Sequence, residues 1–205
     1  MYTCADCDVV ACTQGKSEEL PKNCPMRTMD MRERILPEYM SEENHEFYIQ
    51  SSGIEADGYC QWPRLRETLE FCRRMEYSKI GIAFCKGLRK EARIVARLFR
   101  KYGFTVVSVI CKTGGISKEE AGIPEDKKIH PEEFEAMCNP IGQAALLNAQ
   151  DTQFNIAIGL CVGHDSLFYR NSKAPVTTLV AKDRVHAHNP CGAVYCADGY
   201  YRNRL

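Results

Sequence analysis

The alternation of strand-like and helix-like segments in the C-terminal part of the chain constrains its fold more than any other feature. Lys79–Cys85 and Phe104–Cys111 predict two strands, and the amphipathic segment Leu88–Tyr102 between them predicts a helix. Parallel strands joined by a right-handed crossover are the usual structure of such a unit. Two more apolar runs, Phe154–Leu160 and Val176–Ala181, predict a third and a fourth strand. We therefore expect a three-layer, Rossmann-like α/β fold with a mainly parallel sheet.

Three regions follow from these patterns. Residues 79–205 form the expected α/β domain, and residues 28–78 carry helical periodicity, which predicts a helical connector. Residues 1–27 have no regular apolar pattern but contain four cysteines, so we expect a small Cys-rich metal-binding module there. Within the α/β domain, Pro131–Met137 and Pro140–Ala149 predict two further short helices.

Twelve cysteines are the most unusual feature of the composition. The N-terminus has neither the basic nor the apolar stretch of a secretory signal, so we expect a cytoplasmic protein whose thiols stay reduced. Metal ligands, redox thiols and buried packing residues then explain the cysteines better than a disulfide framework. The formal net charge is zero and no apolar run could span a bilayer, so we expect neither a membrane nor nucleic acid as a partner.

The four N-terminal cysteines are candidate metal ligands: Cys4, Cys7, Cys12 and Cys24. They supply a full tetrahedral set for Zn²⁺, and metal binding would give this short polar segment the folding free energy that it lacks. A [4Fe–4S] cluster also takes four thiolates, and a proline directly after the last cysteine occurs in ferredoxin-type sequences. We therefore expect zinc, or else an iron–sulfur cluster, at these residues.

A second group of cysteines is predicted to meet at one edge of the sheet. Cys85, Cys111 and Cys161 each lie where a predicted strand ends. The carboxyl ends of neighbouring parallel strands lie about 5 Å apart, along the edge where α/β sheets bind ligands. Cys138 precedes a predicted helix and His164 follows Cys161, so both can face the same crevice. Packing remains the alternative for each cysteine taken alone, because cysteine is among the most frequently buried residues.

Basic residues also follow the predicted strands. Lys86 comes after the first strand and Lys112 after the second, and helix N-termini at the same edge add positive potential. A small anionic molecule is therefore expected as a partner, with Lys86 and Lys112 as its binding residues. The chain contains no G-x-G-x-x-G or Walker A sequence, so a standard dinucleotide or ATP site is not predicted.

Several segments of the chain resemble a family of prokaryotic proteins. The resemblance rests on Cys4-x2-Cys7-x4-Cys12, Cys85-Lys-Gly-Leu-Arg-Lys-Glu-Ala, Cys138-Asn-Pro-Ile-Gly-Gln-Ala, Gly159-Leu-Cys-Val-Gly-His-Asp, and Lys182-Asp-Arg with His188-Asn-Pro. It covers nearly the whole chain and points to uncharacterised metal-binding proteins, a domain of unknown function typical of anaerobic bacteria and archaea. The resemblance implies metal binding, with the four N-terminal cysteines as ligands, and assigns no role to the inner cysteines.

Two functions are consistent with the sequence. The first is a metalloprotein in which Cys85, Cys111 and Cys161, together with Cys138, hold an iron–sulfur cluster for redox or sulfur-transfer chemistry. Cys161 and His164 would then be the catalytic residues, with His164 as the proton donor. The alternative is a non-catalytic, zinc-stabilised module that binds a small anionic ligand in a regulatory role. Thiol–disulfide chemistry without a metal ranks last, because the α/β part has no Cys-x-x-Cys at the start of a helix.

Overall fold

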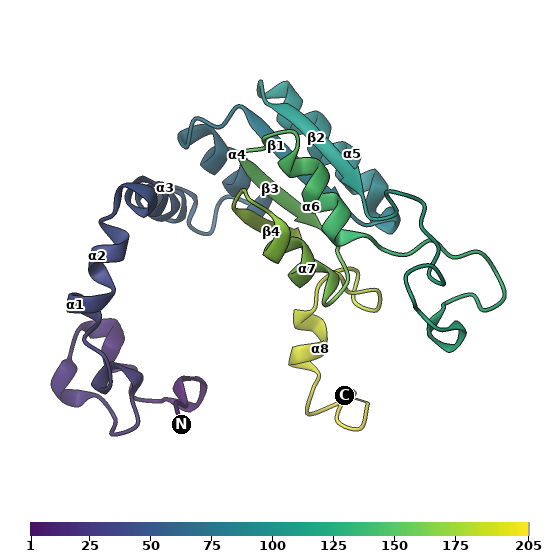
Figure 1. Cartoon of the computed structure of the whole chain (residues 1–205). Coiled ribbons are helices and arrows are strands. Elements are labelled where there is room, and N and C mark those ends of the chain that lie inside the picture. Colours follow the sequence, from purple (N-terminus) through teal and green to yellow (C-terminus); the bar gives the residue numbers. More distant parts are fainter. Residues whose placement is uncertain (205) are drawn as a thin grey trace. The chain divides into compact units, whose positions relative to one another are not determined.

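In the computed structural model, which describes residues 1–204, the chain forms two compact units, Met1–Tyr59 and Cys60–Leu205 (Figure 1). The first unit consists of short turns followed by helices. The second unit contains every strand of the described sheet.

The first unit has little apolar core. Its N-terminal 3-10 turns are Cys4–Asp6, Ala11–Gln14, Ser17–Glu19 and Pro25–Arg27, and its helices are α1 (Met31–Arg34), α2 (Leu36–Tyr39) and α3 (Glu42–Gly58). Among residues 1–59, all of which the structure describes, Ala11, Leu20 and Ile54 are the only buried apolar side chains. Burial on this scale is too small to order a polar segment unless a metal or another cross-link helps.

The second unit is built on a sheet of four parallel strands (Figure 1). The strands are β1 (Lys79–Phe84), β2 (Thr105–Ile110), β3 (Phe154–Ile158) and β4 (Val176–Val180), in the order β2-β1-β3-β4. β3 is buried along its whole length, as expected for a strand that is covered on both faces. β2 lies on one side of β1 and β3 on the other, so the strand order reverses between β1 and β3.

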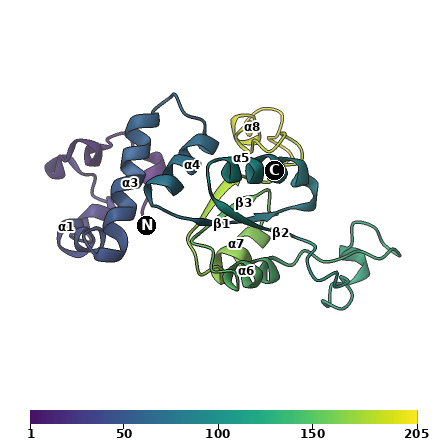
Figure 2. The same cartoon turned by 90° about the horizontal axis from the view of Figure 1, so that it is seen from above.

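Helices cover both faces of this sheet (Figure 2). α5 (Arg89–Lys101) lies on one face, and α6 (Pro140–Asn148) and α7 (His164–Asn171) lie side by side on the other. The remaining helices are α4 (Arg64–Arg74), which contacts β4, and α8 (Cys191–Tyr195) near the C-terminus. The expected three-layer, Rossmann-like α/β architecture is confirmed. Within residues 1–204, no helix is both long and apolar enough to cross a membrane.

Small strand residues let helices pack closely on the sheet. Ala83 and Ala157 form a buried cluster with Leu147 of α6 and Phe168 of α7.

Cys72 of α4 is fully buried, and burial raises the pKa of its thiol to about 12. Cys72 therefore behaves as a small apolar packing residue.

The predicted helix at Pro131–Met137 is wrong. This stretch belongs to an irregular loop, in which Ser117 and Ala136 form an antiparallel bridge. Phe134, the aromatic residue of the stretch, is exposed, so a short helix here would have no apolar face to bury. Isolated helices of this length are not stable without such packing.

Candidate functional site

The inner cysteines lie at the carboxyl edge of the sheet. Cys85 directly follows β1 and Cys111 directly follows β2. Their backbone N–H groups extend the strand pairing: Cys111 donates to Phe84 O at 2.8 Å and Cys85 donates to Ile158 O at 3.0 Å. Cys161 lies in the turn between β3 and α7. The cysteines therefore lie around the reversal of strand order, where open α/β sheets bind their ligands.

Cys138 and His164 reach the same edge from other segments. Asn139 caps α6 by accepting a hydrogen bond from the Gly142 N–H at 2.8 Å. The backbone N–H of Asn139 donates to Cys111 O at 2.7 Å, which holds Cys138 next to the end of β2. His164 is the first residue of α7.

These side chains line one narrow cavity. Its lining residues are Cys85, Cys111, Cys138, Pro140, Gln143, Leu160, Cys161 and His164. Its volume of about 10 Å³ is close to that needed for one water-sized molecule. We call Cys85, Cys111, Cys138 and Cys161 the inner thiol site. The structure thus brings together the four inner cysteines and His164 that the sequence singled out.

The thiols of this site influence one another's protonation. Cys111 hydrogen-bonds to Cys138 and to Cys85, and its Sγ accepts a hydrogen bond from the Lys86 backbone N–H at 3.2 Å. Hydrogen bonding with Cys111 lowers the pKa of Cys85 and the pKa of Cys138, and the same contacts raise the pKa of Cys111. Neighbouring thiols cannot all ionise unless positive charge is close by.

Positive charge is present at three of the thiols. The pairs are Cys85 with Lys182, Cys138 with Lys112, and Cys161 with Arg184. The Arg184 guanidinium donates to the Cys161 sulfur at 3.2 Å, which raises the pKa of the guanidinium. Lys112 also donates to the carbonyl of Ala136, so its ammonium group interacts both with Cys138 and with the irregular loop that contains Ala136.

Three polar or charged residues of the cavity and its rim were not among the predicted site residues: Gln143, Lys182 and Arg184. The two basic residues follow the fourth strand at the same sheet edge as Lys86 and Lys112, and this placement was the available signal. Nothing in the sequence indicated that Gln143 lies at the site, because a single polar residue in a short helix is ordinarily exposed to solvent. Binding of an anion by Lys86 and Lys112 stays a prediction.

Thiol reactivity should reflect the lowered pKa values. Thiolate is present above a thiol's pKa and is lost as the pH falls through it, so Cys85 and Cys138 should stay ionised at pH 6, where an ordinary thiol is almost fully protonated. Iodoacetamide at pH 6 should therefore alkylate Cys85 and Cys138 in the folded, metal-free protein faster than in the same protein unfolded in urea. Peptide mass spectrometry measures both rates, and equal or slower alkylation in the folded protein would contradict the expectation.

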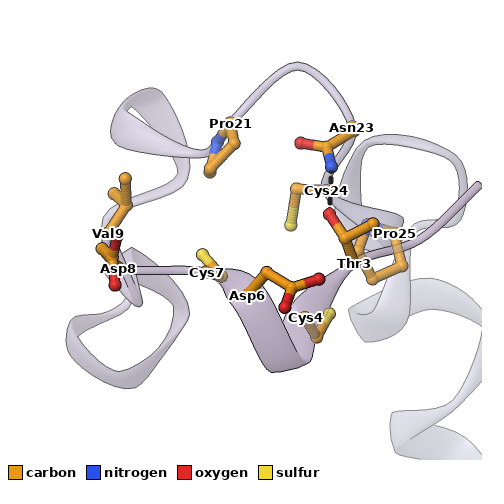
Figure 3. Close-up of a pocket in the computed structure, with 10 residues that line it drawn as sticks. All are labelled: Thr3, Cys4, Asp6, Cys7, Asp8, Val9, Pro21, Asn23, Cys24 and Pro25. Carbon is orange, nitrogen blue, oxygen red and sulfur yellow. Dashed lines mark hydrogen bonds between the residues drawn. The ribbon is translucent and has the colours of Figure 1, made fainter.

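The N-terminal cysteines are arranged more openly (Figure 3). Cys4, Cys7 and Cys24 line a pocket of about 310 Å³, and the sulfur atoms of Cys7 and Cys24 point into the same space. Cys12, the fourth predicted ligand, is not among the residues that line this pocket. Across residues 1–204, no group of three or more His, Cys, Asp or Glu side chains is positioned as it stands to hold a metal ion.

Comparison with known proteins identifies the family of the chain. The family model described as "Protein of unknown function (DUF1847)" matches residues 24–179, a range that includes all four members of the inner thiol site. A protein of Methanocaldococcus jannaschii, named uncharacterized protein MJ0455, is 47% identical over 202 residues, which cover 98% of this chain and 97% of the relative. The chain therefore belongs to the DUF1847 family of proteins of unknown function.

Proposed function

We propose that this protein binds a thiophilic metal ion at the inner thiol site and that its chemistry takes place there. The observation that carries the proposal is the convergence of four cysteines, from distant segments of the chain, on one cavity at the reversal of strand order. Cys85, Cys138 and Cys161 are only partly buried, whereas Cys72, a packing cysteine, is fully buried. Packing alone therefore explains these three cysteines poorly, whereas Cys111 is buried.

The donor set suits a single metal ion, which would have to draw the thiols closer together, because no three of the described His, Cys, Asp or Glu side chains are positioned as they stand to hold one. Thiolates are preferred ligands of zinc and iron, and four of them make a complete tetrahedral set. The lowered pKa values of Cys85 and Cys138 favour the thiolate form that binds metal. A cavity of about 10 Å³ suits one ion better than the iron–sulfur cluster expected from the sequence, which would require the surrounding loops to move apart.

The residues around the thiols have distinct proposed roles. When bound, the ion would supply Lewis acidity, and an iron centre would also supply electron transfer for redox or sulfur-transfer chemistry. Lys182 and Arg184 balance the negative charge of the thiolates that they contact. His164, which lies close enough to Cys138 to lower the pKa of that thiol, is positioned to exchange a proton within the cavity.

Cobalt loading tests this proposal. The background is the double variant Cys4→Ser, Cys7→Ser, because it removes two of the four N-terminal thiols and so breaks their tetrahedral set. Metal-free protein of this background should gain a thiolate-to-Co²⁺ charge-transfer absorption when Co²⁺ is added without oxygen. No such absorption would overturn the proposal. An intense visible absorption of the protein as isolated without oxygen would instead identify an iron–sulfur cluster.

The basic side chains favour a second candidate function, a non-catalytic module that binds a small anion. Lys112, Lys182 and Arg184 surround the cavity and could hold an anion beside the thiols. Metal analysis would distinguish the candidates. One zinc per chain at the N-terminal cysteines, no iron, and unreactive inner thiols would favour the anion-binding module.

We further propose that the N-terminal cysteines bind zinc as a structural staple. The pocket formed by Cys4, Cys7 and Cys24 and the small core of this region support the proposal. Removing zinc with a chelator should therefore make residues 1–27 sensitive to trypsin, with cleavage after Lys16, Lys22 and Arg27, while residues 60–205 resist.

Mass spectrometry of the tryptic fragments measures this effect. The variant Cys4→Ser, Cys7→Ser should be cleaved rapidly with or without chelator, whereas Cys60→Ser, which changes an exposed cysteine outside both sites, should behave like the native protein. Identical cleavage of the native protein before and after chelation would show that no structural metal is bound there.

A further inference from the structure

Gln143 is an unusual residue in the wall of the thiol cavity. It lies on α6, is fully buried, and lines the cavity together with the four cysteines and His164. Its side-chain Nε2 donates to Val109 O at 2.8 Å and to Phe84 O at 3.3 Å, which are carbonyls near the ends of β2 and β1. The Gln143 side chain therefore links α6 by hydrogen bonds to β2 and β1, the strands that Cys111 and Cys85 directly follow.

The carbonyl oxygen of Gln143 has no partner. Within residues 1–204, Gln143 Oε1 is the one buried side-chain nitrogen or oxygen found without a hydrogen bond. The amide orientation is fixed by its surroundings, because both Val109 O and Phe84 O are acceptors and would repel a carbonyl oxygen in the Nε2 position. Oε1 is consequently an unused acceptor in a side chain that lines the cavity.

Unpaired buried acceptors are rare and each needs an explanation, and a bound water molecule or ion is one such explanation. Cys85 and Cys138 are poor donors to Oε1, because their lowered pKa values favour the thiolate, and Cys111, whose pKa is raised, is not a hydrogen-bond partner of Oε1. The cavity volume of about 10 Å³ accommodates one heavy atom with its hydrogens. A water molecule and a hydrosulfide ion share this chemistry: each is a single heavy atom that carries a hydrogen-bond donor.

We propose that the cavity at the inner thiol site binds a small molecule with one heavy atom and at least one hydrogen, either water or hydrosulfide. Gln143 Oε1 accepts a hydrogen bond from this molecule. This inference rests on the proposed function, because such a molecule would be the small ligand that the thiol site acts upon. Gln143 is in this scheme a ligand-positioning residue that selects hydrogen-bearing ligands over bare anions of similar size. Chloride has no hydrogen to donate, so in the cavity its negative charge would face the lone pairs of Oε1, and this repulsion would weaken its binding.

A crystal structure of the metal-free protein, grown and frozen without oxygen, tests the inference, because the cavity then has room for the ligand. Density for one heavy atom within hydrogen-bonding distance of Gln143 Oε1 is expected. An Oε1 paired with a protein side chain, or an Oε1 with no neighbouring density, would overturn the inference. Crystals soaked in hydrosulfide distinguish the two sources, because sulfur gives stronger density than water oxygen at the same position.

Ligand selectivity gives a second test that separates positioning from structural support. In the metal-free Cys4→Ser, Cys7→Ser background, where no ion occupies the cavity, hydrosulfide and chloride are titrated and followed by isothermal titration calorimetry. Gln143→Met should reduce the affinity for hydrosulfide relative to chloride by about tenfold, the size expected for loss of one buried hydrogen bond. Leu147→Met, a buried control on α6 outside the cavity, should leave this ratio unchanged.

The outcomes of the two tests are distinguishable. An unchanged ratio in Gln143→Met with a lowered melting temperature would assign Gln143 a structural role only and overturn the inference. Absence of the Co²⁺ absorption in the background protein would overturn the proposed metal site, and the crystal structure would still decide whether Oε1 holds a ligand. Chloride binding as tight as hydrosulfide in the native cavity would also contradict the inference.

Discussion

Replacing Cys111 with serine is expected to lower metal affinity at the inner thiol site by at least about 100-fold. Loss of an outer-shell partner alone commonly costs 10–100-fold in metal affinity, and Cys111 is proposed as a direct ligand. Cys111 also contacts both Cys85 and Cys138, so its removal leaves those two thiols without their common neighbour. Competition between the protein and a chelator of known affinity for Co²⁺ measures the change.

The matched control for this prediction is Cys60→Ser. Cys60 is exposed and does not line the cavity, so its replacement should leave the affinity unchanged. The Cys4→Ser, Cys7→Ser background again lacks two of the four N-terminal thiols. If Cys111→Ser and Cys60→Ser bind Co²⁺ equally well in this background, Cys111 is not a ligand.

Replacing Gly159 with alanine is expected to lower the free energy of unfolding by roughly 2–5 kcal/mol. Gly159 follows β3 with a φ of +61°, a conformation that costs free energy for any residue with a Cβ. An added Cβ would also clash with Cδ1 and Cγ of Leu88, a buried residue in the 3-10 turn between Cys85 and α5. Urea denaturation followed by circular dichroism measures the loss.

Gly163→Ala separates the two causes. Gly163 has a φ of +82°, but no atom lies within 4 Å of the position that its Cβ would take. Only the backbone strain applies there, so the loss should be about 1–2 kcal/mol. A Gly163→Ala variant as unstable as Gly159→Ala would show that the contact with Leu88 contributes nothing.

Sequence periodicity predicted the α/β unit well because its elements bury regular apolar faces. The four strands and the helices α5 and α6 lie within one or two residues of the predicted positions, and a separate 3-10 turn at Lys86–Leu88 precedes α5. The Pro131–Met137 stretch was mispredicted because its structure depends on contacts with distant residues. The bridge from Ser117 to Ala136 and the ion pair of Lys118 with Glu135 hold this loop, and neither leaves a periodic pattern.

The inner thiol site was predictable in its cysteines and unpredictable in its surroundings. Parallel strands bring their carboxyl ends to one edge, so cysteines at the ends of three strands had to come near one another. Gln143 could not be assigned from sequence, since its role depends on the carbonyls of Val109 and Phe84 facing α6. The pairing of Arg184 with Cys161 likewise follows from the path of the chain after β4.

In the N-terminal region the sequence predicts a metal site but not the structure around it. Its cysteine spacing predicts a metal site, but the absence of apolar periodicity in residues 1–27 gives no basis for predicting how the chain folds around it. Cys4, Cys7 and Cys24 lie around one pocket, and Cys12 is not part of its lining. Whether Cys12 completes a four-thiolate set stays a prediction that the variant Cys12→Ser can test by zinc stoichiometry.

Metal counting in protein kept free of oxygen tests the inner thiol site most directly. Cys4→Ser, Cys7→Ser protein, reconstituted with zinc and iron and then freed of loosely bound ions, should contain about one metal ion per chain, the number expected for a single set of four thiolates. Adding Cys111→Ser and Cys138→Ser should remove this metal. A background protein that contains no metal, or one that keeps its metal without these two cysteines, would contradict a metal site at the inner cysteines.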